Sequence, residues 1–242
     1  ETSIDGWNIG YDEDNATGGI WDLGEPLATF NDEGVQVQPG SDYSEDGTLC
    51  FFTGSGYQEG NGGAGFDDVD GGKTTLESPS FDLLEYDEVV LTFYRWYTNN
   101  IGDNGNSDKW IVRASTDNGN SWAEIINTSI SSASWIKSRF VLSDYIDLTE
   151  NVQFQFIAED IFYDGDAGSG GSLVEAAIDE FKLEFVSNQA FIIGDINSDS
   201  VINVLDVILL VNMVLGFEPP NYSAGDINAD SDINILDVVA LV

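Results

Sequence analysis

The chain contains no histidine, a single cysteine and seven Lys plus Arg residues among its 242 positions. A Ser-His-Asp triad, a Cys-His pair, a His-ligated zinc and a Cys-rich metal site are therefore excluded. No disulfide can form within the chain, and Cys50, in the apolar segment GTLCFFTG, is expected to be a buried small hydrophobe rather than a reactive thiol. The shortage of basic residues argues against nucleic acid and anionic membranes as partners, because both need basic patches.

Acidic residues, by contrast, are abundant. The 44 Asp plus Glu residues give a formal net charge of −37, and self-repulsion at this density opposes compact folding unless cations neutralise part of it. The apolar share of 42%, with 12% aromatic residues, still predicts a folded core. No segment reaches the roughly 18 consecutive apolar residues that a membrane-spanning helix needs. We therefore expect a secreted or cell-surface protein that depends on divalent metal, with calcium affinity in the range of extracellular modules.

Two twelve-residue segments near the C-terminus are almost the same. DINSDSVINVLD at 195–206 and DINADSDINILD at 226–237 match at nine of twelve positions, and a Gly precedes each. In an EF-hand-type loop the oxygen ligands come from positions 1, 3, 5, 7, 9 and 12, with a backbone carbonyl at position 7. Two Asx-rich turns are the alternative, which does not explain a repeat in register. The predicted calcium ligands are Asp195, Asn197, Asp199, Val201, Asn203 and Asp206 in the first loop, and Asp226, Asn228, Asp230, Asp232, Asn234 and Asp237 in the second.

On these residues, the segment Phe191–Val242 resembles the type I dockerin, a calcium-folded module of two loop-helix repeats that docks onto a partner domain called a cohesin. The final ligand is Asp, as in dockerins. Position 6, normally a Gly with positive φ, is Ser200 and Ser231, which should cost each loop on the order of 1 kcal/mol. The basic residues that cellulosomal dockerins commonly carry on their helices are absent. The segment therefore looks more like the dockerin-like repeats found outside cellulosomes.

The segments that follow the two loops are almost entirely apolar. A module of about fifty residues has too little interior to cover two such helices, so the preceding part of the chain, another subunit or a docking partner is expected to cover part of them. The positions where dockerins often select their partner, 10 and 11 of each loop, are also apolar. The predicted partner interface consists of Val204, Leu205, Ile208, Leu209, Ile235 and Leu236.

The residue composition of the sequence changes near residue 187, which predicts one domain at 1–187 and a second at 188–242. Segments with period-two alternation or many β-branched residues dominate the first domain, and turn signals such as DNGN and DGDAGSGG separate them. The fold class is therefore mainly β: an antiparallel β jelly-roll sandwich followed by a small α-helical dockerin-like domain. The predicted strands are 89–97, 109–116, 135–143, 152–159 and 174–185.

The motifs DGW, GGIWDLGEP, DVDGGKTTLESPSFDL and SLVEAAIDEF resemble the MAM-like or carbohydrate-module-like jelly rolls appended to secreted bacterial proteins. This resemblance implies that Asp179, in AIDEF, ligates a structural calcium, as the residue in this place often does in jelly rolls. The candidates for its companion ligands are Asp68, Asp70, Asp42 and Glu1, and solvated loop carboxylates are the alternative.

A pair of aromatic residues marks a candidate sugar platform. In FYRWYTNN, Tyr94 and Trp96 lie on one face of the predicted strand, and Phe93, Arg95 and Tyr97 lie on the other. Tyr94 and Trp96 could stack against a sugar if they point outward. The alternative is that they belong to the core, because a jelly-roll core uses many large aromatic residues.

Together these features predict a secreted, non-catalytic calcium-binding assembly protein. Two Ca²⁺ ions are expected in the dockerin-like domain and one or more in the jelly roll, and the partner is a cohesin-like receptor or a neighbouring copy in an extracellular filament. The alternative is a carbohydrate-binding accessory module of an extracellular polysaccharide-degrading complex. Glycoside hydrolysis needs only two carboxylates, but none of the 44 acidic residues is singled out, so no enzymatic activity is expected.

Overall fold

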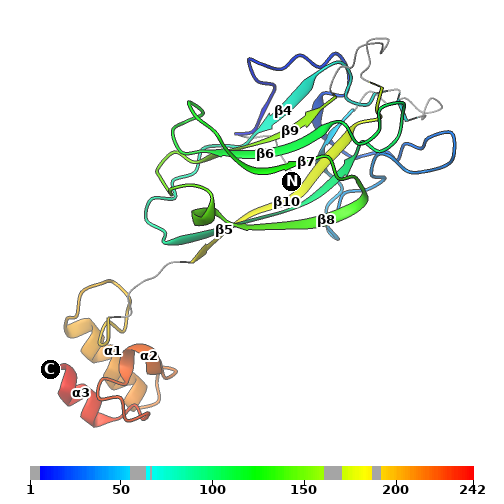
Figure 1. Cartoon of the computed structure of the whole chain (residues 1–242). Coiled ribbons are helices and arrows are strands. Elements are labelled where there is room, and N and C mark those ends of the chain that lie inside the picture. Colours follow the sequence, from blue (N-terminus) through cyan, green and yellow to red (C-terminus); the bar gives the residue numbers. More distant parts are fainter. Residues whose placement is uncertain (1–5, 55–63, 66, 161–170, 187–191) are drawn as a thin grey trace. The chain divides into compact units, whose positions relative to one another are not determined.

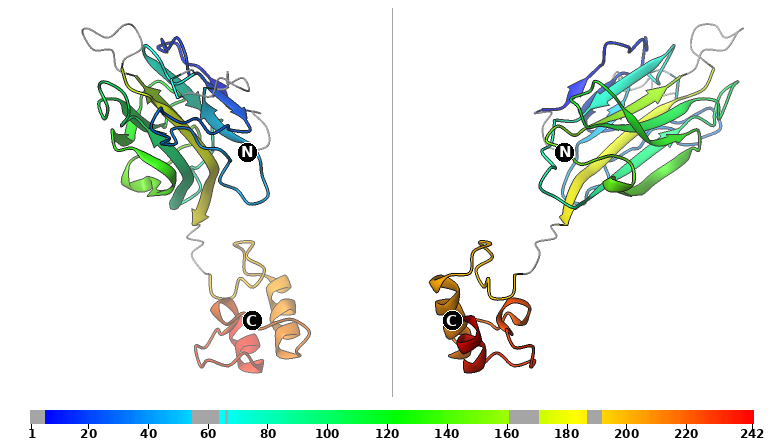
Figure 2. Two further views of the ribbon diagram at one scale, coloured as in Figure 1. Left: turned by 90° about the vertical axis from the view of Figure 1, so that its right-hand side faces the viewer. Right: turned by 60° about the vertical axis from the view of Figure 1, so that its left-hand side comes forward.

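The computed structural model describes residues 6–54, 64–65, 67–160, 171–186 and 192–242. The chain divides into two compact units, Glu1–Val186 and Ser187–Val242. In its described part the first unit is a sandwich of two five-stranded antiparallel sheets that lie face to face (Figures 1 and 2). The second unit is small and helical. The predicted fold class, a β-sandwich followed by a small helical domain, is confirmed.

Each sheet mixes strands from distant parts of the sequence. The first sheet has the order β1 (Asn8–Ile9), β4 (Lys73–Glu77), β9 (Gln153–Glu159), β6 (Lys109–Ser115) and β7 (Ala123–Thr128). The second sheet has the order β2 (Trp21–Gly24), β3 (Cys50–Thr53), β10 (Glu175–Val186), β5 (Glu88–Thr98) and β8 (Ser132–Val141), and a short 3-10 turn follows at Leu142–Asp144.

The alternation along β5 explains how the sheets pack. Leu91, Phe93 and Tyr97 belong to the core between the sheets, whereas Trp96 belongs to a separate cluster on the outer face of the second sheet. Phe93 meets Phe156 of β9 edge to face, with 5.1 Å between the ring centroids. Because β5 and β9 lie in different sheets, this contact joins the two layers of the sandwich.

A long loop, 25–49, covers part of the outer face of the second sheet. Its Val37 carbonyl accepts hydrogen bonds from Trp96 Nε1 at 2.6 Å and from Thr98 Oγ1 at 3.0 Å. Beneath it lies a small apolar cluster that includes Cys50 and Phe52, both buried. Cys50 is therefore a buried small hydrophobe, as predicted.

The five predicted strands correspond to β5, β6, β8, β9 and β10, with ends that move by at most three residues. The remaining strands of the described residues were not predicted. Most of these are short, such as β2 and β3 with four residues each, so they offer little alternation to recognise.

The second unit contains α1 (Val204–Val214), α2 (Tyr222–Gly225) and α3 (Ile235–Leu241) within residues 192–242. Ile196, Leu210 and Ala224 form its buried centre. Both α1 and α3 begin with a capping box, because the N-cap Asn accepts a backbone hydrogen bond and the Asp three residues later bonds back to the N-cap N–H. Neither these helices nor any other helix in the described residues has the length and apolar character needed to cross a membrane.

Candidate metal centre and docking surface

The first predicted loop is held in shape by its own candidate ligands. Asp195 Oδ1 accepts a hydrogen bond from the Asp199 N–H at 3.1 Å, and its Oδ2 accepts one from the Ser200 N–H at 2.8 Å. Asp199 Oδ1 in turn accepts one from the Val201 N–H at 2.9 Å. These bonds close the chain around the carboxylates at positions 1 and 5, so that both belong to one tight turn.

The last candidate ligand, Asp206, ties the loop to the helix that follows it. Its side chain is fully buried, and it accepts hydrogen bonds from the N–H groups of Ile196 at 2.8 Å, Asn197 at 3.2 Å and Asn203 at 2.8 Å. Burial raises the pKa of this carboxyl. The backbone hydrogen bonds together lower it by more than burial raises it, so the pKa lies below its ordinary value. The carboxylate at position 12 is therefore kept ionised and fixed in orientation, as a calcium ligand must be.

The second loop repeats this arrangement. Asp226 accepts hydrogen bonds from the Asp230 and Ser231 N–H groups at 3.0 and 2.9 Å. Asp237 is fully buried and accepts bonds from Ile227, Asn228 and Asn234. The pKa of Asp237 is likewise lowered, because the backbone bonds outweigh the effect of burial. The two loops, which match in sequence, thus adopt the same hydrogen-bonded conformation.

The donor set of each loop suits calcium, which prefers six to eight oxygen ligands from carboxylates, amide carbonyls and the backbone. Within the described residues, no three His, Cys, Asp or Glu side chains are grouped so that they could hold a metal by themselves. The Asn side chains and the backbone carbonyl at position 7 would therefore complete each site. No Lys or Arg follows Lys182 in the sequence, so the carboxylates of the loops have no basic side chain in their own unit to neutralise them.

The backbone at position 6 has the left-handed conformation that the loop pattern predicts. Ser200 has φ +67° and Ser231 has φ +72°, in the left-handed region that glycine normally occupies. A positive φ was not predicted at position 4 of the loops, but Ser198 has φ +59° and Ala229 has φ +57°. Each loop therefore carries two strained residues, not one.

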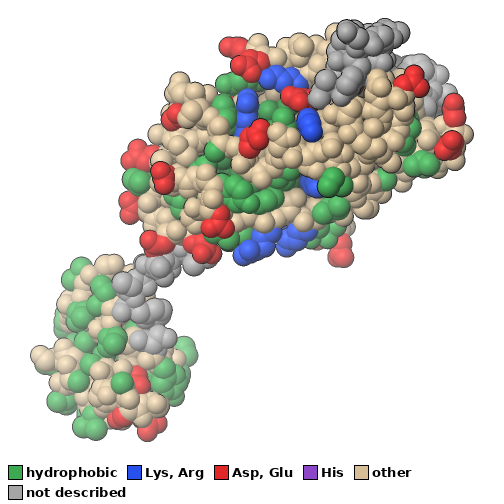
Figure 3. All heavy atoms as spheres, in the orientation of Figure 1, with side chains coloured by type: hydrophobic (Ala, Val, Ile, Leu, Met, Phe, Trp, Pro, Cys, Tyr) green, Lys and Arg blue, Asp and Glu red, His purple; other side chains and the backbone are tan. Residues whose placement is uncertain are grey.

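The helices expose most of the predicted interface. Each repeat presents an apolar triad in the same places, at positions 10, 11 and 14 counted from the first ligand, and the residues of both triads are between 51% and 69% exposed. The space-filling view shows hydrophobic side chains over the visible surface of this unit (Figure 3). The triads, which we call the docking triads, are Val204, Leu205 and Ile208 on α1, and Ile235, Leu236 and Val239 on α3.

Two residues differ from the predicted interface. Leu209 is half-buried and packs against the buried centre of the unit, because it lies on the inward side of α1 next to Leu210. Leu209 therefore offers a partner less surface than the other five predicted residues do, and its place in the interface stays a prediction. Val239, at 69% exposed, was not among the predicted residues. The repeat itself could have revealed it, because Val239 stands where Ile208 stands in the first repeat.

The candidate calcium ligands of the sandwich fall into two groups. Asp179 accepts hydrogen bonds from the Tyr43 and Ser44 N–H groups, next to Asp42, whose Oδ2 accepts one from Ser44 Oγ at 2.6 Å. Asp68 and Asp70 instead line a separate cavity of about 300 Å³ together with Asp103. The candidate Glu1 lies outside the described residues.

These two groups are associated with different positions of β10. Asp68 interacts electrostatically with Glu175, which lies four residues before Asp179 on β10, a separation of about 13 Å along a strand. Burial, together with the charge of Asp70, raises the pKa of Asp68 to about 7. Burial and the charge of Asp68 also raise the pKa of Glu175 well above its ordinary value.

The predicted sugar platform is not exposed. Trp96 is 6% exposed, because the loop 25–49 covers it and its indole N–H is bonded to Val37. The ring of Tyr94 is covered by that of Tyr43, with 3.4 Å between the centroids and 15° between the planes. The prediction that Tyr94 and Trp96 form a stacking surface was therefore wrong, since a distant loop uses both rings as its own contacts.

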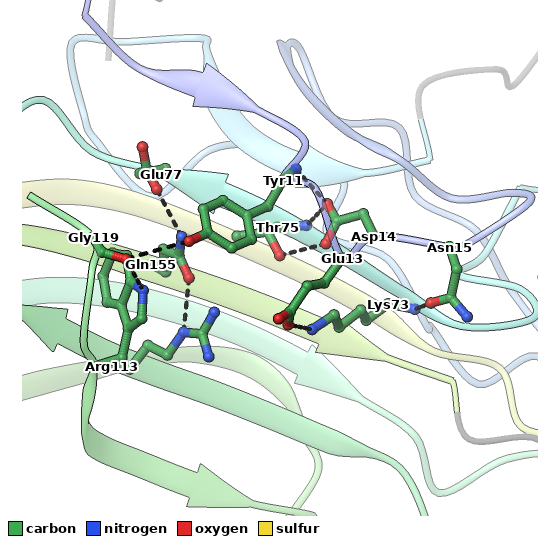
Figure 4. A network of polar contacts seen from close by, with 11 residues as sticks. Tyr11, Glu13, Asp14, Asn15, Lys73, Thr75, Glu77, Arg113, Gly119 and Gln155 are labelled. Atoms are coloured by element: carbon green, nitrogen blue, oxygen red, sulfur yellow. Dashed lines mark hydrogen bonds and ion pairs between the residues drawn. The ribbon is translucent and has the colours of Figure 1, made fainter.

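On the outer face of the first sheet, polar side chains bind one another instead (Figure 4). Arg113 Nε donates to Gln155 Oε1 at 2.7 Å, and Gln155 Nε2 donates to Glu77 Oε2 at 2.6 Å, so that the contacts run across β6, β9 and β4. The Arg113 guanidinium also lies 5.0 Å from the ring centre of Trp122. Because Gln155 is fully buried between its partners, this network holds three strands together.

Comparison with solved structures finds distant fold likenesses, and the three described here each have a TM-score below 0.5. A tailspike protein of bacteriophage CBA120 matches at 9% identity over 76% of this chain, with a TM-score of 0.43, and this chain covers only 20% of its length. A carbohydrate-binding module, TmCBM61 in complex with β-1,4-galactotriose, matches at 13% identity over 76% of this chain and 91% of its own, with a TM-score of 0.40. The K1 cleaved adhesin domain of Lys-gingipain from Porphyromonas gingivalis matches at 15% identity over 75% of this chain and 98% of its own, with a TM-score of 0.36.

No curated protein sequence matches this chain. A family match exists for the second unit alone: residues 193–242 match the dockerin type I domain. That range contains both loops and all three helices. Dockerin domains bind calcium and make calcium-dependent contacts with protein partners. Residues 193–242 of this chain are therefore a dockerin type I domain, which follows a β-sandwich.

Proposed function

We propose that the chain is a secreted, non-catalytic assembly protein, and that its dockerin domain uses the docking triads of α1 and α3 to bind a protein partner when calcium fills both loops. The exposure of the triads carries this proposal. Six aliphatic side chains, each more than half exposed, repeat in register in a domain of fifty residues. Isolated exposed aliphatic residues are common, but a repeated apolar set on two helices is typical of a protein contact surface.

Calcium would control this contact through the helix starts. Asp206 and Asp237 are the candidate ligands at position 12, and each is also the third residue of its helix and part of its capping box. The first two residues of each triad precede this Asp directly, and the third follows it by two positions. Calcium binding and the ordering of the triads would therefore be coupled, because the free energy of calcium binding would also stabilise the helix starts that carry the triads.

Two partners fit an apolar surface without basic residues: a cohesin-like receptor and a second copy of this chain. We favour the second copy, because the basic residues that cellulosomal dockerins carry are absent from α1 and α3. Repeated head-to-tail contact between copies would build a filament if the rotation does not close.

The test is size-exclusion chromatography with light scattering on the full chain, first in calcium and then in EGTA. We expect assemblies larger than a monomer in calcium and monomers in EGTA. A double substitution, Leu205→Asp with Leu236→Asp, should abolish assembly, whereas Ile130→Asp, at a 73% exposed position of the sandwich, should not. A monomer in both conditions, with unchanged circular dichroism, would exclude self-assembly and leave a receptor as the partner to be sought.

A further inference from the structure

A cleft of about 560 Å³ lies within the loop 25–49 of the sandwich. This volume falls in the range of roughly 300–1,000 Å³ that is usual for small-molecule sites. Tyr43, Leu27 and Pro26 supply its apolar lining, while Glu25, Asp42 and Glu45 supply carboxylates. The cleft thus joins a planar aromatic surface to hydrogen-bond acceptors.

Tyr43 is the only aromatic residue among those that line this cleft. It is 41% exposed, although one face of its ring is stacked on Tyr94. Since Tyr94 covers one face of the ring, the opposite face and the ring edge are the parts that a ligand can reach. A ring that is supported from behind by a second ring is a rigid platform, which loses little side-chain freedom when a ligand stacks on it.

The loop that carries Tyr43 is fixed at several points. Asp179 accepts hydrogen bonds from the Tyr43 and Ser44 N–H groups at 2.8 and 3.1 Å. The indole N–H of Trp135 donates to the Ser41 carbonyl at 3.2 Å, and Trp96 holds Val37. The cleft is consequently formed before any ligand arrives.

The charges around the two tyrosines select the class of ligand. Glu25, Asp42 and Glu45 lie on the cleft side, whereas Lys137 Nζ lies 5.9 Å from the centre of the Tyr94 ring and Lys182 interacts electrostatically with Tyr94. A polyanion would be repelled by the carboxylates, and a polycation by the lysines. Carboxylates only accept hydrogen bonds, so a neutral ligand whose hydroxyl groups donate complements the acceptors that line the cleft.

We propose that this cleft binds a neutral saccharide, with a pyranose ring stacked on the open face of Tyr43 and its hydroxyl groups bonded to the carboxylates of the loop. The site belongs to the sandwich and does not depend on what the dockerin domain binds.

The proposal is tested by affinity electrophoresis of the full chain in native gels that each contain one neutral polysaccharide: hydroxyethylcellulose, arabinoxylan, galactan or galactomannan. We expect retardation in at least one gel. Tyr43→Ala should weaken that binding at least tenfold, and Tyr43→Phe, which keeps the ring, should stay within about twofold. Tyr145→Ala is a matched control, because Tyr145 is also 41% exposed but does not line the cleft and contacts Phe140 instead.

Three results would overturn the proposal. The first is the absence of retardation in all four gels, and the second is equal weakening by Tyr43→Ala and Tyr145→Ala. The third is that the ligand proves to be charged: polygalacturonate retards the chain where the neutral polymers do not, or a fluorescent oligolysine peptide binds in a manner that Tyr43→Ala abolishes. Near-ultraviolet circular dichroism of each variant shows whether the sandwich remains folded.

Discussion

Asp179 of β10 holds the backbone of Tyr43, a residue 136 positions earlier in the chain, by a 2.8 Å hydrogen bond from the Tyr43 N–H to its buried carboxylate. The same oxygen accepts the Ser44 N–H, and the other carboxylate oxygen accepts the Glu180 N–H. One acidic side chain in the centre of a sheet thus fixes a loop on its outer face. The stability of that loop should depend on this carboxylate whether or not it also binds calcium.

Replacing Asp179 by Ala should therefore destabilise the sandwich by about 1–3 kcal/mol, the usual effect of leaving buried backbone donors without their acceptor. Urea unfolding followed by tryptophan fluorescence measures this change. Asp179→Asn keeps one acceptor oxygen and should lose less, and Asp147→Ala, at an exposed acidic position, should lose almost nothing. If Asp179→Ala unfolds at the same urea concentration as the parent, the carboxylate does not hold the loop.

The thiol of Cys50 should be unreactive in the folded chain. Cys50 is fully buried under the same loop, and burial, together with the negative charges of Asp179 and Asp42, raises the pKa of its thiol. Because only the thiolate reacts quickly, Ellman's reagent should modify Cys50 far more slowly in buffer than in concentrated urea. A rapid reaction of the native protein would show that the loop opens readily. In Asp179→Ala the rate should rise, since that variant loses both the charge and the anchor.

Local patterns predicted a large part of this structure. The two dockerin loops were recognisable because their candidate ligands, turns and helix starts all lie within twelve residues, and the same pattern occurs twice. Alternation likewise identified the longer strands, such as β5 and β10, because each has enough residues to show a period of two.

The environment of Tyr94 and Trp96 could not be predicted in this way. Alternation assigned both residues to the same face of β5, and this assignment was right for Trp96, which lies on the outer face. However, alternation does not show which distant segment covers a face. The loop 25–49 supplies Val37 and Tyr43 to these two side chains, and its course depends on Asp179, more than a hundred residues away. Tyr43 itself stands in a polar stretch, GSDYSEDG, where no periodicity marks it.

The strained serines of the calcium loops offer a gain in stability. Ser200 and Ser231 both have positive φ, so Gly at these positions should remove about 1 kcal/mol of strain from each loop. If the strain opposes metal binding, Ser200→Gly and Ser231→Gly should each raise the calcium affinity of that loop about fivefold, which isothermal titration calorimetry can measure. Ser143→Gly serves as the control, because Ser143 is exposed and is not among the residues with positive φ. Unchanged or weaker calcium binding in both loop variants would mean that the serine side chains contribute at least as much to the free energy of calcium binding as the backbone strain costs.

Removing one position 12 carboxylate should show how the two loops share the domain. In Asp237→Ala, the N–H groups of Ile227, Asn228 and Asn234 lose their acceptor, and α3 loses one half of its capping box. We expect the calcium stoichiometry of the dockerin domain to fall from two to one and the helical circular dichroism to decrease, since a lost cap alone costs about 0.5–2 kcal/mol. Asp206→Ala should produce a larger loss of helix, because α1 has eleven residues and α3 has seven. Asp147→Ala should change neither quantity. If Asp237→Ala still binds two ions in this domain with unchanged affinity, the ligand assigned to position 12 is wrong and the loops hold calcium by another set of oxygens.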